Sequence, residues 1–240
     1  MKKRIIVVVI LAAAAGVIWK FTHKGDFLYA GTIEATEVDV SSRASGVIEQ
    51  YKATEGCDIA KNATLVSLEC NDVRLAADIA QKDYARAKEL LTAGSMSQEN
   101  YDRLKYRRDD AALRQDWCTI KSPVGGTVLY KYHENGELIN AGTKLATVAD
   151  LSEVYAYVYV PHDIISKLSV GMEVDGILPE MNNRVFPGRI TVINEEAEFT
   201  PKNVQTQSER TRLVFGVKVT FKNPDRLLKP GMTIEAKLPS

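Results

Sequence analysis

Two stretches of this chain repeat one pattern at a constant spacing of 80 residues. Four residue types match between the copies: Gly46 with Gly126, Gly56 with Gly136, Ile59 with Ile139, and Leu65 with Leu145. A constant spacing needs no insertion or deletion, so it indicates that one structural unit occurs twice. Each copy alternates short apolar runs with glycine turns, which is typical of strands and turns. The sequence therefore predicts two β-units that close on each other as a small β-sandwich, with the intervening segment projecting outward.

The segment between the copies carries a helical pattern. In its first arm, apolar and small residues recur at spacings of three and four: Val73, Ala77, Ala80, Tyr84, Ala87 and Leu91. This spacing predicts a coiled-coil seam. Gly94 ends the arm, and Ser95 or Ser97 can cap the next one. The second arm continues a weaker, more polar seam: Tyr101, Leu104, Arg108, Ala111 and Gln115. Each arm has about 20 residues, so the hairpin should reach about 30 Å.

The chain after the second copy reads as strands. Val154, Ala156, Val158 and Val160 alternate with Tyr155, Tyr157 and Tyr159. Further apolar runs are separated by the turn signals Pro187-Gly188, Asn223-Pro224 and Pro230-Gly231. Several strands divided by such turns predict a small β-barrel.

The N-terminus predicts a membrane anchor. The basic cluster Lys2–Arg4 precedes an apolar run from Ile5 to Trp19. Positive charge before such a run places its N-terminus in the cytoplasm. The alternative is a cleaved signal peptide, because Ala13–Ala15 could supply the cleavage site. We favour the uncleaved anchor, since cleavage there would leave Val17–Trp19 on an exposed new terminus. Either interpretation places the rest of the chain outside the cytoplasm.

Four segments carry a family resemblance. The run Ile120–Gly126 is similar to the entry into the second half of the biotinyl/lipoyl fold in HlyD-type membrane fusion proteins, the periplasmic adaptors of bacterial export systems. Leu151–Val158 resembles the strand that opens their β-barrel, and Pro230–Met232 resembles its closing turn. Glu195–Arg210 resembles a segment common in adaptors encoded with ABC-type exporters. Together, the order and spacing of these segments give a resemblance that covers nearly the whole chain.

The resemblance implies a mostly β fold with an α-helical hairpin. A split biotinyl/lipoyl-like β-sandwich is interrupted by a coiled-coil hairpin and followed by a small β-barrel. We expect the following parts: a signal-anchor helix at 1–24, an extended segment at 25–40, sandwich halves at 41–71 and 119–150, the hairpin at 72–118 and the barrel at 151–240.

The resemblance also implies partners. It predicts an adaptor that is anchored in the inner membrane, with the bulk of the chain in the periplasm. Such an adaptor forms a ring, commonly of six copies, and links an inner-membrane transporter to a TolC-like outer-membrane channel. An ABC-type exporter is the favoured transporter, and a proton-driven multidrug efflux pump is the alternative. The formal net charge is zero, and no stripe of basic residues suggests a nucleic acid partner.

Three residues near the hairpin tip are the candidate site. Arg86, Leu90 and Ser97 have the spacing R-x3-L-x6-S. In family members that work with TolC-like channels, this pattern contacts the channel's helical ends. Arg86 and Leu90 share a helix face, so Arg can bind carbonyls or carboxylates while Leu fills a groove. The alternative is a solvated Arg, a Leu that packs within the hairpin, and a Ser that only caps a helix.

The sequence offers no catalytic, metal or cofactor site. The three histidines, His23, His133 and His162, lie far apart, and neither HExxH, GxSxG nor a P-loop is present. A lipoyl or biotinyl carrier is the alternative from another class. Such carriers bear an acceptor lysine on the turn between their halves, whereas this chain has Cys70, Asn71 and Asp72 there. We therefore expect a protein that is not an enzyme and holds no cofactor.

The cysteines are Cys57, Cys70 and Cys118. Cys70 and Cys118 should lie at the two feet of the hairpin, so a disulfide between them is one interpretation. We favour the other, in which both are unpaired, half-buried thiols. No CxxC motif indicates a redox or zinc site.

Overall fold

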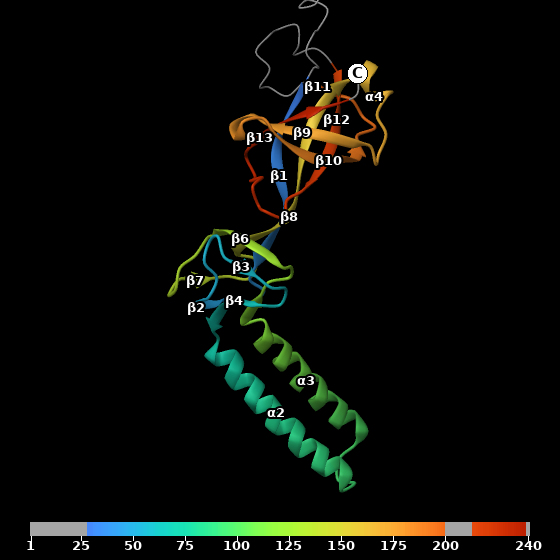
Figure 1. The fold of residues 1–240 in the computed structure, drawn as a ribbon. Helices are drawn as coiled ribbons and strands as arrows, with labels where there is room; N and C mark the ends of the chain where they lie inside the picture. The colour runs from blue at the N-terminus through green and yellow to red at the C-terminus, as the bar shows by residue number, and fades with distance from the viewer. Residues whose placement is uncertain (1–27, 200–212, 239–240) are drawn as a thin grey trace, which may run out of the picture. The chain divides into compact units, whose positions relative to one another are not determined.

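The computed structural model describes residues 28–199 and 213–238. The expected anchor helix at 1–24 and residues 200–210 of the exporter-like segment lie outside this range. The chain divides into two compact units, residues 35–152 and residues 1–34 with 153–240 (Figure 1). Among the helices that the structure describes, none is both long and apolar enough to cross a membrane.

The first unit is a sandwich of two four-stranded sheets with a helical hairpin. One sheet has the order β5-β4-β2-β7, and the other, part of a larger sheet, has the order β1-β8-β6-β3. The strands are β1 (Leu28–Ser41), β2 (Gly46–Tyr51), β3 (Asp58–Ile59), β4 (Thr64–Glu69), β5 (Thr119–Lys121), β6 (Gly126–Lys131), β7 (Leu138–Ile139) and β8 (Lys144–Pro161). The helices are α2 (Asn71–Thr92) and α3 (Gln98–Asp116).

The duplication that the sequence predicts is visible in the strand pairing. Ile59 of β3 pairs with Gly126 of β6, and Ile139 of β7 pairs with Gly46 of β2, so each half lends a short strand to the other. Both long pairings have a bulge at the same repeat position, after Ile48 in β2 and after Val128 in β6. Strand exchange of this kind means that neither half completes its sheet without the other.

Glycine turns join the two halves. Gly56 has φ +80° and Gly136 has φ +87°, a backbone conformation that residues with a side chain rarely adopt. The Gly56 amide donates to the Val128 carbonyl at 2.8 Å, and the Gly136 amide donates to the Ile48 carbonyl at 2.8 Å. The repeated glycines therefore close equivalent turns of each half onto the other.

One continuous apolar cluster fills the sandwich. Leu65 and Leu145, equivalent residues of the repeat, are fully buried, and Ile48, Val66, Val128 and Val148 lie in the same cluster. Full burial of such a side chain contributes about 1.5–3 kcal/mol. This core fixes the position of β4 and β5, the two strands between which the hairpin is inserted.

The second unit is a closed barrel. In its described part the strands follow the closed order β8-β12-β10-β9-β13-β1, with β1 adjacent to β8 and β11 added beside β12. Its further elements are α4 (His162–Ile165), β9 (Glu173–Leu178), η1 (Pro179–Met181), β10 (Arg184–Ile193), β11 (Glu198–Phe199), β12 (Leu213–Lys222) and β13 (Thr233–Lys237).

The alternation that predicts the barrel is realised in β8. Its valines and Ala156 face the interior, where Val154, Val158 and Val160 are fully buried. The tyrosines lie on the other face, where the Lys218 ammonium sits 3.6 Å from the Tyr155 ring centroid. The predicted fold class, a split sandwich with a helical hairpin and a small barrel, is confirmed.

Candidate functional site

The candidate site is the helical hairpin between the two halves of the sandwich. The helix α2 ends at Thr92, and Gly94 with φ +70° turns the chain. Ser97 is the N-cap of α3, where its Oγ accepts from the Asn100 amide at 3.4 Å. Of the two caps that the sequence allows, Ser95 or Ser97, the structure uses Ser97.

The seam between the helices is thin. Ala77 and Ala87 are the only buried residues of α2, and no residue of α3 is buried. The Tyr84 and Tyr101 hydroxyls hydrogen-bond at 2.9 Å, and their ring centroids are 5.6 Å apart. The Arg108 guanidinium stacks 4.1 Å from the Tyr84 ring centroid. Small residues and one polar aromatic cluster therefore hold the helices together.

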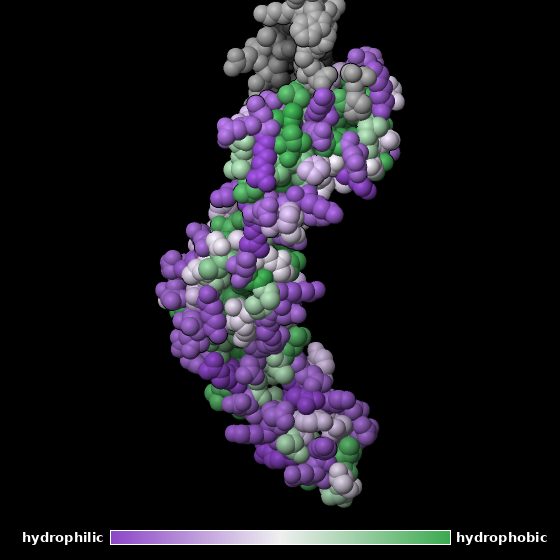
Figure 2. Space-filling view, in the orientation of Figure 1, coloured by the Kyte–Doolittle hydropathy of each residue, from purple (hydrophilic) through white to green (hydrophobic). Residues whose placement is uncertain are grey.

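A second set of apolar residues lies outside the buried seam. These side chains are exposed: Leu75, Ile79 and Leu90 on α2, and Tyr106 and Leu113 on α3. At 100° per residue, Leu75, Tyr106 and Leu113 lie opposite to the seam. Ile79 and Leu90 lie to the side of it, and Ile79 lines a groove together with Leu104 of α3. Figure 2 shows a mainly hydrophilic hairpin surface with separate hydrophobic residues. Of these five residues only Leu90 was predicted to lie at a contact surface, although the helical spacing of Leu75 to Ile79 and of Tyr106 to Leu113 is visible in the sequence.

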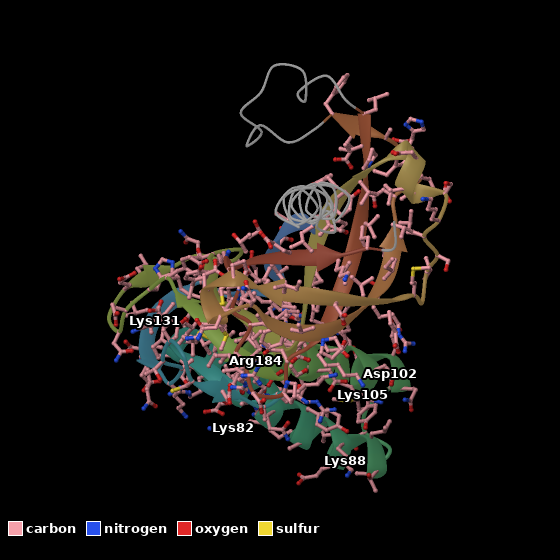
Figure 3. The ribbon with its side chains drawn as sticks, turned by 45° about the horizontal axis from the view of Figure 1, so that its top comes forward. Lys82, Lys88, Asp102, Lys105, Lys131 and Arg184 are labelled. Carbon is pink, nitrogen blue, oxygen red and sulfur yellow. A yellow bond between two sulfur atoms is a disulfide. The ribbon has the colours of Figure 1, made fainter. Side chains whose placement is uncertain are left out.

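The three predicted tip residues are all accessible. The Arg86 side chain is 72% exposed and forms an ion pair with Asp83, one turn away. Leu90 is 45% exposed and does not lie in the seam. Ser97 is exposed, and its hydroxyl caps α3. Lys82 and Lys88 lie on the same helix (Figure 3), where they alternate with the acidic residues Asp83 and Glu89.

The feet of the hairpin are covalently joined. Cys70, the N-cap of α2, forms a disulfide with Cys118, and their Cα atoms are 6.3 Å apart. The expectation of two unpaired thiols is therefore wrong. The cause is the pairing of β4 with β5, in which the Leu68 amide donates to the Cys118 carbonyl at 2.9 Å. Cys57 is a free, exposed cysteine.

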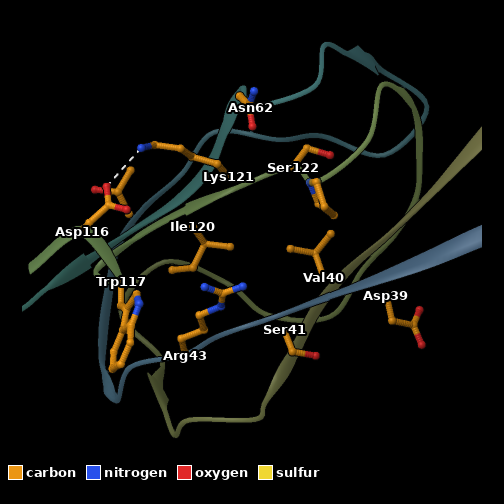
Figure 4. A pocket seen from close by; sticks show the side chains of 12 residues that line it. Asp39, Val40, Ser41, Arg43, Asn62, Asp116, Trp117, Ile120, Lys121 and Ser122 are labelled. Carbon is orange, nitrogen blue, oxygen red and sulfur yellow. Dashed lines mark hydrogen bonds and ion pairs between the residues drawn. The ribbon is translucent and has the colours of Figure 1, made fainter. Parts of the chain in front are cut away.

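A cleft near the hairpin foot has a volume of about 430 Å³ (Figure 4). It lies between β1 and β5, and Arg43 and Trp117 are among its lining residues. Lys121 and Asp116 form an ion pair of 3.1 Å at its edge. These residues do not form a nucleophile–base pair, and among the described residues no cluster of three His, Cys, Asp or Glu side chains could hold a metal.

Two titratable groups of the sandwich with shifted pKa values take part in its hydrogen-bond networks. Burial raises the pKa of Tyr51 to about 12, and its hydroxyl donates to the Leu145 carbonyl at 2.6 Å. Hydrogen bonds from Lys144 and Thr147 lower the pKa of Asp39 below its usual range. Lys144 also lies 4.7 Å from the Tyr132 ring centroid.

Comparison with solved structures identifies the architecture. A chimera of MacA and MexA that contains the α-hairpin domain of Pseudomonas aeruginosa MexA superposes with a TM-score of 0.72 at 22% identity, over 89% of this chain and 81% of that one. The membrane fusion protein Spr0693 of Streptococcus pneumoniae R6 gives a TM-score of 0.62 at 19% identity, over 89% and 99%. The fold is that of a membrane fusion protein.

Relatives by sequence match a shorter part of this membrane fusion fold. A UPF0194 membrane protein of Acidithiobacillus ferridurans is 32% identical over 120 residues, and one of Yersinia enterocolitica is 30% identical over 119 residues. Each match covers 50% of this chain and 36% of the relative. This chain thus matches about a third of the length of its curated relatives. No family model matches the sequence.

Proposed function

We propose that this chain is a periplasmic adaptor, anchored in the inner membrane, that links an ABC-type exporter to a TolC-like outer-membrane channel. The observation that carries the proposal is a helical hairpin that projects from a lipoyl-like sandwich and leaves its apolar side chains uncovered. The seam buries only two alanines, whereas five larger apolar side chains face outward. An element of this kind is suited to protein contacts, not to covalent chemistry on a transported compound.

The outward residues support assembly into a ring. Leu75 and Ile79 lie on α2, and Tyr106 and Leu113 lie on α3, so two different surfaces of one hairpin are available. Contact between two different surfaces of neighbouring copies is heterologous and closes into a ring when the rotation allows. Six copies, as the resemblance implies, would place all the hairpin tips at one end of the ring.

The tip is proposed to contact the channel. Arg86 is held only by an exposed ion pair with Asp83, which contributes little to stability. Its guanidinium can therefore exchange Asp83 for carbonyl or carboxylate groups at the helical ends of the channel. Leu90 lies one turn further toward the tip and can fill an apolar groove of the same partner.

The transporter type rests on the resemblance of Glu195–Arg210 to a segment of ABC-associated adaptors. A proton-driven multidrug efflux pump is the alternative, and the transporter that co-purifies with the chain decides between them. A lipoyl or biotinyl carrier would need an acceptor lysine between β4 and β5, where Cys70 and α2 follow directly. An added lipoyl or biotinyl mass on the purified chain would favour the carrier.

The decisive variant is Arg86→Asp. Loss of one desolvated charged contact costs about 2–5 kcal/mol, which is sufficient to uncouple a weak docking contact. The same change on a solvated helix should alter folding stability by about 0.5 kcal/mol. We expect the outer-membrane channel to co-purify with the full chain from mild detergent and to be lost with Arg86→Asp, at unchanged expression and thermal unfolding.

Lys82→Asp is the matched control, because Lys82 is an exposed cation one helical turn further from the tip. This variant should retain the channel better than Arg86→Asp. Normal retention by Arg86→Asp, or a loss that only accompanies unfolding, would show that the tip assignment is wrong.

A further inference from the structure

The disulfide at the hairpin foot lies where the apolar cluster of the sandwich meets a polar groove. Cys70 and Cys118 are 3% and 7% exposed, and both line a groove of about 180 Å³. The charged residues Arg74 and Glu49 line the same groove. The groove gives a small thiol a route to the two sulfurs, which otherwise pack into the apolar cluster. We propose that the Cys70–Cys118 disulfide is a thiol-exchange site for low-molecular-weight thiols, and that its opening releases the foot of the hairpin.

The two sulfurs are not equivalent as leaving groups. Cys70 is the N-cap of the 22-residue helix α2, so a thiolate there lies at the positive end of the helix dipole. Arg74, one turn into α2, adds a positive charge to the groove on the α2 side, while Glu49 of β2 adds a negative one. Cys118 follows the C-terminal end of α3, where the dipole disfavours a thiolate. Because a more stable thiolate leaves faster, attack should fall on Cys118.

The exchange takes place in two steps. The thiolate of the small molecule forms a new bond to Cys118 Sγ, and the bond between Cys118 Sγ and Cys70 Sγ breaks with its electron pair on Cys70. A second thiolate then attacks the sulfur of the small molecule in the mixed disulfide and releases the Cys118 thiolate. Two thiols are oxidised to one small disulfide, and the protein disulfide is reduced by two electrons.

Beyond the pairing of β4 with β5 and the burial of the two sulfurs, the hairpin itself supplies little packing to keep its foot closed. The seam buries only Ala77 and Ala87, so packing between the helices is weak. Trp117, directly before Cys118, has a buried Nε1 with no hydrogen-bond partner among the described residues. Opening the foot would hydrate this N–H group, which favours the open form once the disulfide is broken.

The test uses L-cysteine as the thiol and the full chain in detergent. Cys57→Ser removes the exposed free thiol, so that every adduct reports on the disulfide. We expect acid-quenched peptide maps to show the cysteine adduct on Cys118 and a free, alkylatable Cys70. Amide exchange should rise at both helix feet as the adduct forms.

Arg74→Gln tests the role of the groove charge. Loss of a nearby cation should slow the exchange about two- to five-fold, in line with the usual strength of such charges at a helix end. Arg114→Gln is the control, because Arg114 lies near Cys118 on α3 but pairs with Asp110 at 2.9 Å and does not line the groove. It should leave the rate unchanged.

Three results would overturn the proposal. They are an adduct mainly on Cys70, no adduct until the protein is denatured, and free thiols at both positions before the thiol is added. The reaction is read on the purified chain without transporter or channel. Its outcome is therefore independent of the adaptor function proposed above.

Discussion

The sandwich and the hairpin belong to one compact unit, yet they are stabilised in different ways. The sandwich buries a continuous apolar cluster and exchanges strands between its halves. The hairpin buries two alanines, exposes five large apolar side chains, and is closed at its foot by a disulfide. The sandwich therefore contains within itself what it needs to fold. The hairpin should gain stability from partners that cover its surface, since short helices with little packing are marginal in water.

The largest expected difference between the two regions is in the cost of removing a leucine. Leu65→Ala removes a fully buried side chain of the sandwich and should lower the free energy of unfolding by about 2–5 kcal/mol. Leu91→Ala removes a half-buried seam residue of the hairpin and should cost less than about 1 kcal/mol. Urea unfolding, with amide exchange to locate the affected region, measures both.

An equal cost for both leucines would contradict the comparison, because it would mean that the isolated hairpin is packed as firmly as the sandwich.

Amide exchange near Gly94 adds a second check. That tip should be protected far less in the free chain than in the assembled exporter, if partners complete the packing.

The repeat made the sandwich predictable from sequence. Matching glycines and apolar residues at a spacing of 80 mark equivalent turns and strands in the two halves. They do so because few other residue types can replace a turn glycine or a buried leucine. The seam of α2 was equally predictable, because the buried residues Ala77 and Ala87 lie where the helical period places them. Local pattern and global fold agree in these places.

The disulfide was not predictable in the same way. Cys70 and Cys118 are 48 residues apart, and only the register of β4 against β5 decides whether they meet. No periodic pattern of a single segment contains that register. Apart from Leu90, the exposed apolar residues of the hairpin were not predicted for a different reason, since apolar residues on several faces of a helix weaken its amphipathic signal.

The second prediction compares the same substitution at two equivalent glycines of the repeat. A Cβ at Gly126 would lie 2.4 Å from the Ala149 carbonyl oxygen, whereas one at the equivalent Gly46 would lie 3.1 Å from the Glu69 carbonyl oxygen. Gly126→Ala should therefore destabilise the sandwich by about 1–3 kcal/mol, and Gly46→Ala by less. Thermal unfolding of the two variants gives the ranking. A reversed order would show that the two halves are less alike in packing than their register indicates.

The third prediction concerns the polar cluster of the seam. Tyr101→Phe removes the hydrogen bond to the Tyr84 hydroxyl but keeps the ring contact, so the hairpin should lose about 0.5–1.5 kcal/mol. Tyr106→Phe is the control, because Tyr106 is exposed on the outward face. Amide exchange of α3 should rise for Tyr101→Phe alone. Equal exchange in both variants would mean that the hydroxyl pair does not hold the seam.

The smallest effect is expected at the surface of the sandwich, where Asp39 bonds to Lys144 at 2.8 Å and accepts from the Thr147 hydroxyl at 2.8 Å. These contacts lower the pKa of Asp39, with the Lys144 hydrogen bond as the main cause. A lowered carboxyl pKa stabilises the fold above the ordinary Asp pKa of about 3.9, and this contribution is lost as the pH falls through the folded value. Asp39→Asn should therefore be less stable than the parent at neutral pH, and the gap should narrow below pH 4. Asp78→Asn, on the exposed face of the hairpin, should leave the pH profile of stability unchanged. A gap for Asp39→Asn that stays constant down to pH 2 would show that the carboxylate charge does not stabilise this face.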